Sequence, residues 1–353
     1  MTKNNKTTQY FVEIIPTGYY FFGNERTFMT TVQDKYSETI TNYFAESNIL
    51  PQQTAVLGML RYTLLALYDK LNATQAEKAL LIGKEGFSEN KDHAFGLIEA
   101  ISPIFIFEQV SKMLLMPIGF DHQKYEKVDT HFVYNHAENV PTYLYGNAEN
   151  VPDLEKYNYK EELNLLWKDT SNKVYTEEEL FKSITKVGVN KVKTDEAFYK
   201  QTFKGLKEKG YAFGVWVDFD ESIDETKLKE ILVPFGADQG LFKLRFRTDI
   251  PYMLDEQRAA SPTQILLLSD AWIAEKTFED IDFGITQYTD FRFIEEKTRD
   301  YYNLQSAGKS TKFVLLKRGS VLYPKPDFNI KDLQHDAFCR IGYNYFQHAH
   351  SRR

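Results

Sequence analysis

The stretch Pro51-Gln-Gln-Thr-Ala-Val-Leu-Gly-Met-Leu-Arg-Tyr-Thr-Leu-Leu-Ala-Leu-Tyr68 is the strongest indicator of the fold of this chain. Its valine and leucines recur at the spacing of one wide helix face, which predicts a well-buried helix. Pro51 and Thr54 are typical of a helix start. Gly58, which weakens a helix interior, predicts a close approach to a sheet. Arg61 is a lone charge on this apolar helix and needs a partner.

The segments on either side of this helix predict β-strands. Tyr10–Ile15 alternates as a strand before the helix, and Gly96–Ile101 and Ile104–Val110 form two short apolar runs after it, joined through Ser102-Pro103. A strand, a helix and then paired antiparallel strands form the beginning of a ferredoxin-like unit.

The second half of the chain predicts another unit of the same kind. Strands are expected at Gly210–Phe219, at Gly240–Arg247 with basic residues on one face, at Gln264–Ser269, and on both sides of Lys317-Arg-Gly319. We therefore predict an α+β protein with two ferredoxin-like (RRM-like) domains and antiparallel sheets, covering residues 1–190 and 191–353. Residues 121–185 are acidic and hold two Asn-Val-Pro breaks, so they predict a loop-rich insertion with one helix near Lys160–Trp167.

The charge of the chain is unevenly distributed. The 353 residues carry a net charge of −7, yet the segment Lys297–Arg353 carries +7 on its own. Phosphate contacts need clustered Lys and Arg, so this basic segment is the best place for a nucleic acid, and the acidic remainder suits protein partners. The polar N-terminus and the shortness of the apolar runs predict a cytoplasmic protein without a membrane segment.

Motifs for catalysis, metals and cofactors are scarce. The single cysteine, Cys339, rules out an internal disulfide and predicts an inert core thiol. Gly308-Lys309-Ser310 lacks the upstream glycine and strand of a phosphate-binding P-loop. Asp218 and Asp220 form an Asp-x-Asp pair at a strand end, where carboxylates most often cap the chain or face water. No metal and no cofactor are predicted.

Five motifs in order resemble one family, subunit three of the Cmr complex, a RAMP-superfamily protein of type III-B CRISPR systems. They are Phe21-Phe-Gly-Asn-Glu-Arg-Thr-Phe28, Pro51-Gln-Gln-Thr-Ala-Val-Leu-Gly-Met-Leu-Arg61, Lys186-Val-Gly-Val189, Lys317-Arg-Gly-Ser-Val-Leu-Tyr323 and Ile341-Gly-Tyr-Asn344. The first of these lacks one arginine and the proline of the family pattern. The resemblance extends from Tyr10 to Phe346.

The resemblance implies two RAMP domains and a role without catalysis. It implies that the chain holds the 5′ handle of a CRISPR RNA (crRNA). It also implies protein partners, namely the large polymerase-like Cmr subunit and a backbone RAMP subunit. Single-stranded RNA is held by phosphate contacts and by base stacking on aromatic rings.

The residues expected at the RNA combine these motifs with their chemistry. Near the first two motifs they are Phe22, Asn24, Arg26, Phe28, Gln52, Gln53, Thr54 and Arg61, with the amides at the helix start expected to face a phosphate. In the basic C-terminal segment they are Lys309, Lys312, Lys317, Arg318, Arg340 and Tyr343. For Arg61, contact with RNA and pairing with an internal carboxylate remain equal alternatives, and for Tyr343 a core position remains open.

Three other functions remain possible at this point. One is the equivalent handle-binding subunit of type III-A (Csm) complexes. Another is a RAMP endoribonuclease that processes crRNA, although the first histidine in the chain is His93 and such enzymes use an early general acid or base. A third is an unrelated α+β enzyme.

Overall fold

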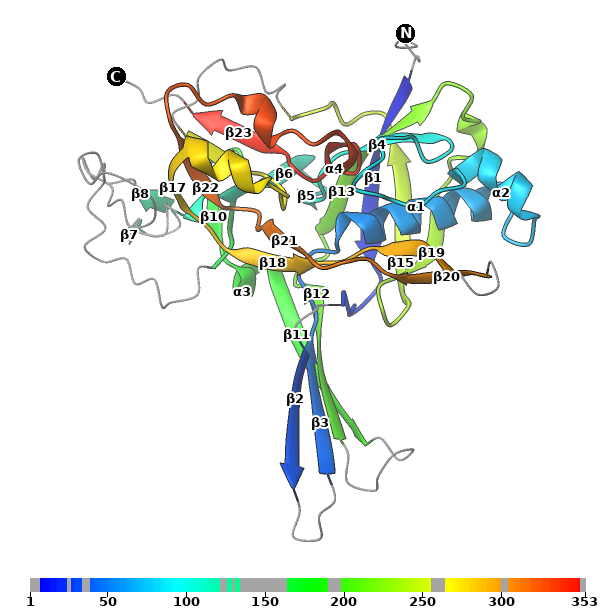
Figure 1. Ribbon diagram of the computed structural model, residues 1–353, viewed down its shortest axis with the longest axis horizontal. Coiled ribbons are helices and arrows are strands. Elements are labelled where there is room, and N and C mark those ends of the chain that lie inside the picture. Colours follow the sequence, from blue (N-terminus) through cyan, green and yellow to red (C-terminus); the bar gives the residue numbers. More distant parts are fainter. Residues whose placement is uncertain are drawn as a thin grey trace.

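A computed structural model describes residues 7–23, 27–33, 39–120, 126–128, 131–133, 164–189, 198–254, 264–299 and 304–349. Figure 1 shows a broad body from which a long arm of strands projects.

The body is built on one large sheet with the first strand near its middle. Strand β1 (Thr7–Pro16) pairs antiparallel with β13 (Tyr211–Asp220) on one side and with β15 (Gly240–Arg247) on the other. The order across the sheet is β10-β9-β6-β5-β13-β1-β15-β14, and β4 also pairs with β13. The remaining strands are β4 (Ile98–Ile101), β5 (Phe105–Glu108), β6 (Met113–Ile118), β9 (Leu166–Lys168), β10 (Val174–Tyr175) and β14 (Ile231–Phe235).

Alternation along β1 gives the sheet two apolar faces. Val12 and Ile14 point to the face covered by α1 (Gln53–Leu67), where they share a core with Leu60 and Leu64. Phe11 points the other way and packs in a separate core with Trp216, Ile250 and Leu268. Helix α2 (Gln75–Ile82) lies beside α1 and has no fully buried residue, although Ile82 packs against the core that α1 covers.

The C-terminal part of the body forms a smaller sheet with its own core. Its order is β17-β22-β16-β23, with bounds β16 (Gln264–Leu267), β17 (Ile281–Ile285), β22 (Val321–Pro324) and β23 (Phe346–Ala349). Three strand pairs are separate: β18 (Tyr288–Phe291) with β21 (Phe313–Leu316), β19 (Ile294–Arg299) with β20 (Leu304–Lys309), and β7 (Glu126–Val128) with β8 (His131–Val133). Short helices are α3 (Glu177–Leu180), α4 (Asp336–Arg340), η3 (Glu225–Lys227), η4 (Glu275–Asp280) and η5 (Ile330–Leu333).

The arm is a four-stranded sheet assembled from two distant parts of the chain. Its order is β11-β12-β3-β2, with bounds β2 (Thr27–Gln33), β3 (Thr39–Glu46), β11 (Phe181–Val189) and β12 (Phe198–Leu206). The pair β12–β3 is parallel, and the other two pairs are antiparallel. At the base of the arm the buried ammonium of Lys204 lies 2.9 Å from Glu46 and 2.8 Å from Glu177, which ties the arm to α3.

The predicted α+β fold with mostly antiparallel sheets is confirmed, and α1, β1, β13 and β15 lie where the sequence placed them. Two details were wrong. Leu166–Lys168 is a strand where the end of a helix was expected, and residues 160–163 of that predicted helix lie outside the described residues. Gly58 is exposed, and a Cβ there would meet nothing within 4 Å, so it makes no close approach to the sheet.

The division near residue 190 stays a prediction. The large sheet takes β1, β5 and β6 from before this point and β13 and β15 from after it. The sheet therefore does not by itself mark a boundary there.

Candidate nucleic-acid interface

A cleft of about 380 Å³ lies beside the start of α1. Several segments far apart in the sequence line it, among them the chain from the end of β3 to α1, the turn after β21, and the segment that follows α4. Five of the residues expected at the RNA line this cleft together: Gln52, Gln53, Lys317, Arg318 and Tyr343. The structure thus brings the second, fourth and fifth sequence motifs to one place.

The start of α1 is fixed by a buried cluster of hydrogen bonds. The Gln53 amide side chain donates to the carbonyls of Ser102 (2.8 Å) and Ile341 (2.7 Å) and accepts from the backbone N–H of Ile104 (3.2 Å). Gly342 has φ +89°, and a Cβ there would lie 1.9 Å from Gln53 Nε2. The fifth motif therefore needs its glycine so that the backbone can approach Gln53 closely.

The amides at the helix start are already engaged. The backbone N–H of Gln53 donates to the hydroxyl of Tyr343 (3.2 Å), which Thr54 also contacts by hydrogen bonds, and Tyr343 is 1% exposed. The carbonyl of Gln52 accepts from Ala55 and Val56 in the first turn. Gln53 and Tyr343 are thus core residues, and a phosphate at these amides, as expected from the sequence, would have to displace the phenol.

The turn Lys317-Arg-Gly-Ser320 presents two cations to the cleft. The Gly319 N–H donates to the Leu267 carbonyl, and the Ser320 N–H donates to the Lys317 carbonyl. Gly319 has φ +86°, a conformation that L side chains rarely adopt. Lys317 Nζ lies 3.4 Å from the Gln287 side-chain oxygen. The fourth motif therefore specifies a tight turn whose two basic residues line the cleft.

Arg318 is a buried cation whose partners are incomplete. Its side chain lies over the ring of Phe105, and among the described residues its Nη1 has no hydrogen-bond partner. The Asp270 carboxylate accepts from the backbone N–H of Arg318 (2.8 Å). Burial lowers the pKa of Arg318 to about 10, against the opposing effect of Asp270, and burial raises the pKa of Asp270. Both charges are therefore held at an energetic cost.

Several other predicted residues lie elsewhere or are already engaged. Phe22 is 3% exposed and packs against Tyr20, Phe235 and Phe242, so the prediction that it stacks on a base does not fit its core position. It still lies beside the cleft through its backbone, which bridges to Asn48. Asn24 and Arg26 lie outside the described residues, as does the side chain of Phe28 in β2.

Four basic residues do not line the cleft. Arg61 donates to the carbonyl of Gly83 (3.2 Å), a backbone partner in place of the carboxylate that was one alternative, and burial lowers its pKa. Arg340 pairs with Asp92 and donates to the Glu99 carbonyl (2.7 Å).

The other two are lysines near the strand pairs of the body. Lys312 pairs with Asp290 (2.7 Å). Lys309 is exposed at the end of β20, so the Gly308-Lys309 segment is a strand and not a phosphate-binding loop.

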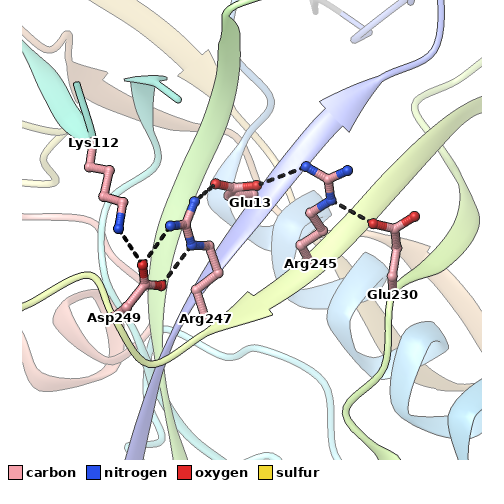
Figure 2. A network of polar contacts seen from close by, with 6 residues as sticks. All are labelled: Glu13, Lys112, Glu230, Arg245, Arg247 and Asp249. Carbon is pink, nitrogen blue, oxygen red and sulfur yellow. Dashed lines mark hydrogen bonds and ion pairs between the residues drawn. The ribbon is translucent and has the colours of Figure 1, made fainter. Parts of the chain in front are cut away.

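The basic face of β15 is neutralised by carboxylates. Figure 2 shows Arg245 and Arg247 on either side of Glu13, whose side chain is 1% exposed, with further contacts to Glu230, Asp249 and Lys112. Arg247 lies 2.5 Å from Glu13 and 2.7 Å from Asp249. This strand is therefore a poor candidate for phosphate binding in spite of its composition.

The arm carries basic and aromatic side chains that sequence reasoning did not select. Lys182, Lys186 and Lys200 are exposed, Tyr199 is 38% exposed, and Val187 is 69% exposed. Lys186 Nζ lies 4.0 Å from the centre of the Phe203 ring. Neither Phe181–Val189 nor Phe198–Leu206 alternates regularly between apolar and polar residues, so the sequence carried only a weak strand signal there.

The remaining chemical candidates are not assembled into a reactive site. Among the described residues no group of three or more His, Cys, Asp or Glu side chains could hold a metal ion. Asp218 accepts from Gln9 (2.7 Å), and Asp220 caps the turn at Ser222 (2.9 Å). Burial raises the pKa of the Cys339 thiol to about 11, which keeps it protonated and unreactive near neutral pH. No helix of the described chain is long and apolar enough to span a membrane.

A comparison with protein families decides which family the motifs belong to. A family model described as CRISPR-associated protein (Cas_Cmr3) matches residues 12–282. The chain belongs to the Cmr3 family. The family predicted from the five motifs is thereby confirmed, and the match favours the Cmr type over the type III-A alternative.

A solved structure shares the fold of this Cmr3-family chain. A chain of the type III-B Cmr-beta complex bound to cognate target RNA matches with a TM-score of 0.50 and 14% identity, covering 96% of both chains. A second chain, from the Cmr-beta complex with cognate target RNA and AMPPnP, gives a TM-score of 0.49 and 15% identity over 95% of both chains. None of the curated proteins compared with the chain matches it significantly.

Proposed function

We propose that this chain is a non-catalytic subunit of a type III-B CRISPR effector complex that holds the 5′ handle of the crRNA. Membership in the Cmr3 family carries this proposal. The cleft beside α1 supports it, because two cations from the Lys317-Arg318 turn and the polar start of α1 meet there. Arg26 and Phe28, which follow the segment that bridges to the cleft wall, are proposed as further contacts.

The protein partners are proposed to be the large polymerase-like subunit and a backbone RAMP subunit. The acidic balance outside the C-terminal segment suits a protein whose surface mostly meets protein rather than RNA. The arm adds an extended surface with exposed lysines, a tyrosine and a valine, a composition suited to single-stranded RNA in an assembly.

The test is a pull-down of the tagged chain from cells that carry its neighbouring CRISPR genes, followed by sequencing of bound RNA. We expect the large and backbone subunits to co-purify with short RNAs that share one 5′ handle. An RNA-free chain without these subunits would contradict the proposal. In parallel, the purified chain is incubated with labelled crRNA precursor and Mg²⁺. Cleavage by this chain alone would favour the endoribonuclease alternative.

A further inference from the structure

Strand β11 forms an open edge of the arm that projects from the body (Figure 1). It stands at the end of the order β11-β12-β3-β2, and at 9 residues it is the longest edge strand of the sheets that the structure describes. It pairs with β12 in one continuous register from Phe181 to Val189. An edge strand presents a row of unpaired backbone N–H and C=O groups, which another strand can join.

Both faces of β11 are uncovered beside this edge. Residues 182–187 are all exposed, although successive side chains of a strand point to opposite faces of the sheet. Ile184 is 40% exposed on one face, and Val187 is 69% exposed on the other. A strand added along β11 would therefore cover apolar surface on both faces of the arm, in addition to pairing with the backbone.

The open edge of the large sheet differs from β11 in its protection. Strand β14, which ends that sheet, is 5 residues long and contains Pro234, a residue with no backbone N–H to offer. Strand β11 contains no proline, and its charged residues are Lys182 and Lys186. Lysines on an edge strand oppose pairing with an identical strand. Two copies of this chain would bring these lysines together, so a second copy is not the partner that fits β11.

The charge of the arm favours an acidic strand as the partner. Strands β11 and β12 contain four lysines and no Asp or Glu. One of them, Lys204, is paired with two carboxylates at the base of the arm. The other three, Lys182, Lys186 and Lys200, leave the exposed part of the two strands positive. An acidic segment would be attracted to this edge.

Two of these lysines mark positions along an added strand. Lys182 and Lys186 lie on the same face as Ile184, because each is two residues away from it. Their ammonium nitrogens lie 5.3 Å from the centre of the Tyr19 ring and 4.0 Å from the centre of the Phe203 ring, which holds them against the arm. Opposite charges directly across a strand pair stabilise it. Carboxylates four residues apart, with an apolar residue midway, would match this face.

We propose that the edge of β11 binds an extended segment of a partner protein as a fifth strand of the arm. The segment carries carboxylates beside Lys182 and Lys186 and an apolar residue beside Ile184. Main-chain pairing provides the affinity of such contacts, and the side chains provide the specificity. Single-stranded RNA could contact the lysines, but it has no N–H and C=O groups at the spacing of a strand. The proposal goes beyond the RNA role proposed above and does not depend on it.

The test measures the binding of synthetic peptides to the full chain by fluorescence anisotropy. The labelled peptide Thr-Glu-Val-Val-Val-Glu-Thr, acetylated and amidated, has the same sequence in both directions and so presents its glutamates to the lysines in either orientation. We expect it to bind saturably. The matched peptide Thr-Lys-Val-Val-Val-Lys-Thr should bind about fivefold more weakly or worse, because two attractive charge pairs become repulsive.

A charge exchange in the protein should reverse this preference. In Lys182→Glu with Lys186→Glu, the lysine peptide should bind more tightly than the glutamate peptide. The control is Lys276→Glu with Lys331→Glu, which changes the net charge equally at exposed lysines of the body and should keep the wild-type preference. Thermal unfolding of both double variants checks that each is folded.

A third peptide separates strand pairing from charge attraction. Methylation of the backbone nitrogens of the three valines leaves the charges of the glutamate peptide unchanged but removes N–H groups that would pair with β11. Binding of this peptide should fall about 10-fold or more, the scale of lost hydrogen bonds.

Four results would overturn the proposal. They are absence of saturable binding at millimolar glutamate peptide, equal affinity for the glutamate and lysine peptides, undiminished binding of the methylated peptide, and an unchanged preference in the folded Lys182→Glu, Lys186→Glu variant. Binding of oligo(rU)8 that needs these two lysines, without binding of the glutamate peptide, would assign them to RNA and leave the proposed function standing. Peptide binding as expected, without RNA binding, would support the proposal and count against the RNA role alone.

Discussion

Two glycines in this chain have opposite physical roles. At Gly342 the left-handed backbone and the contact with Gln53 exclude any side chain, whereas Gly58 is exposed on α1 with open space where a Cβ would lie. The same substitution, glycine to alanine, can be made at both sites. Any difference in its effect on stability then comes from the backbone conformation and the neighbours of each site.

Gly342→Ala should destabilise the protein by at least about 3 kcal/mol, combining backbone strain with the loss of hydrogen bonds from Gln53. Gly58→Ala should stabilise it by up to about 1 kcal/mol, because alanine is the better helix former. Urea unfolding of both variants gives the two values. A Gly342→Ala protein as stable as the wild type would contradict the account of how α1 is anchored.

Gln53 and Arg318 show why a site is harder to predict than the residues in it. The motifs around both were visible in the sequence, as were the turn glycine at position 319 and the basic character of its neighbours. The burial of Gln53 under Ile341 and Ser102, and the position of Asp270 behind Arg318, depend on contacts between segments far apart in the chain. Such long-range contacts cannot be predicted from one sequence alone.

At the scale of elements, the strands of the arm were the secondary structure that the sequence analysis predicted least well. Strands β11 and β12 fell in or near the region expected to be loops, because their lysines and threonines interrupt the apolar alternation. A strand that is solvated on both sides lacks the pattern that marks a half-buried strand. Helix α1 and strands β1 and β13 were predicted correctly because each has a strongly apolar face that packs in a core.

The lysines of the arm should contribute to RNA affinity through charge. Lys186→Glu combined with Lys200→Glu changes exposed positions, so the free energy of unfolding should change by less than about 1 kcal/mol. If each lysine contacts one phosphate, the slope of log K against log salt concentration should fall by about 1.4.

Filter-binding at several salt concentrations measures this slope. The double variant Lys276→Glu with Lys331→Glu, at lysines of the body away from the cleft and the arm, controls for net charge. An equal change of slope in both double variants would mean that the effect comes from overall charge and not from the arm.

At the scale of the whole molecule, carboxylates paired with arginines and lysines set the response to acid. Ion pairs hold the pKa of Asp249, Asp92 and Glu230 below the usual range, whereas burial raises the pKa of Asp218 and Asp270. A carboxyl with a lowered pKa stabilises the fold above its ordinary pKa, and this contribution is lost as the pH falls through the folded value. The two raised groups act in the opposite sense.

Stability should therefore decline as the pH falls below about 5, with the lowered pKa values of Asp249, Asp92 and Glu230 as one main cause. Urea unfolding at a series of pH values measures the decline. Asp249→Asn removes the carboxyl that Arg247 and Lys112 share, so this variant should be less stable at pH 7 and should lose less stability on acidification. A wild-type pH profile in Asp249→Asn would contradict the role of this ion pair.

The central place of β1 has a consequence for how the protein is made. This strand leaves the ribosome well before both of its neighbours, β13 and β15, which come from residues 211–247. At a synthesis rate of roughly 5–20 residues per second, β1 waits about 10–50 s for partners. During that time its two open edges and its apolar side chains can pair with other nascent chains. Production of this protein should thus depend on holding chaperones more than its final stability would suggest.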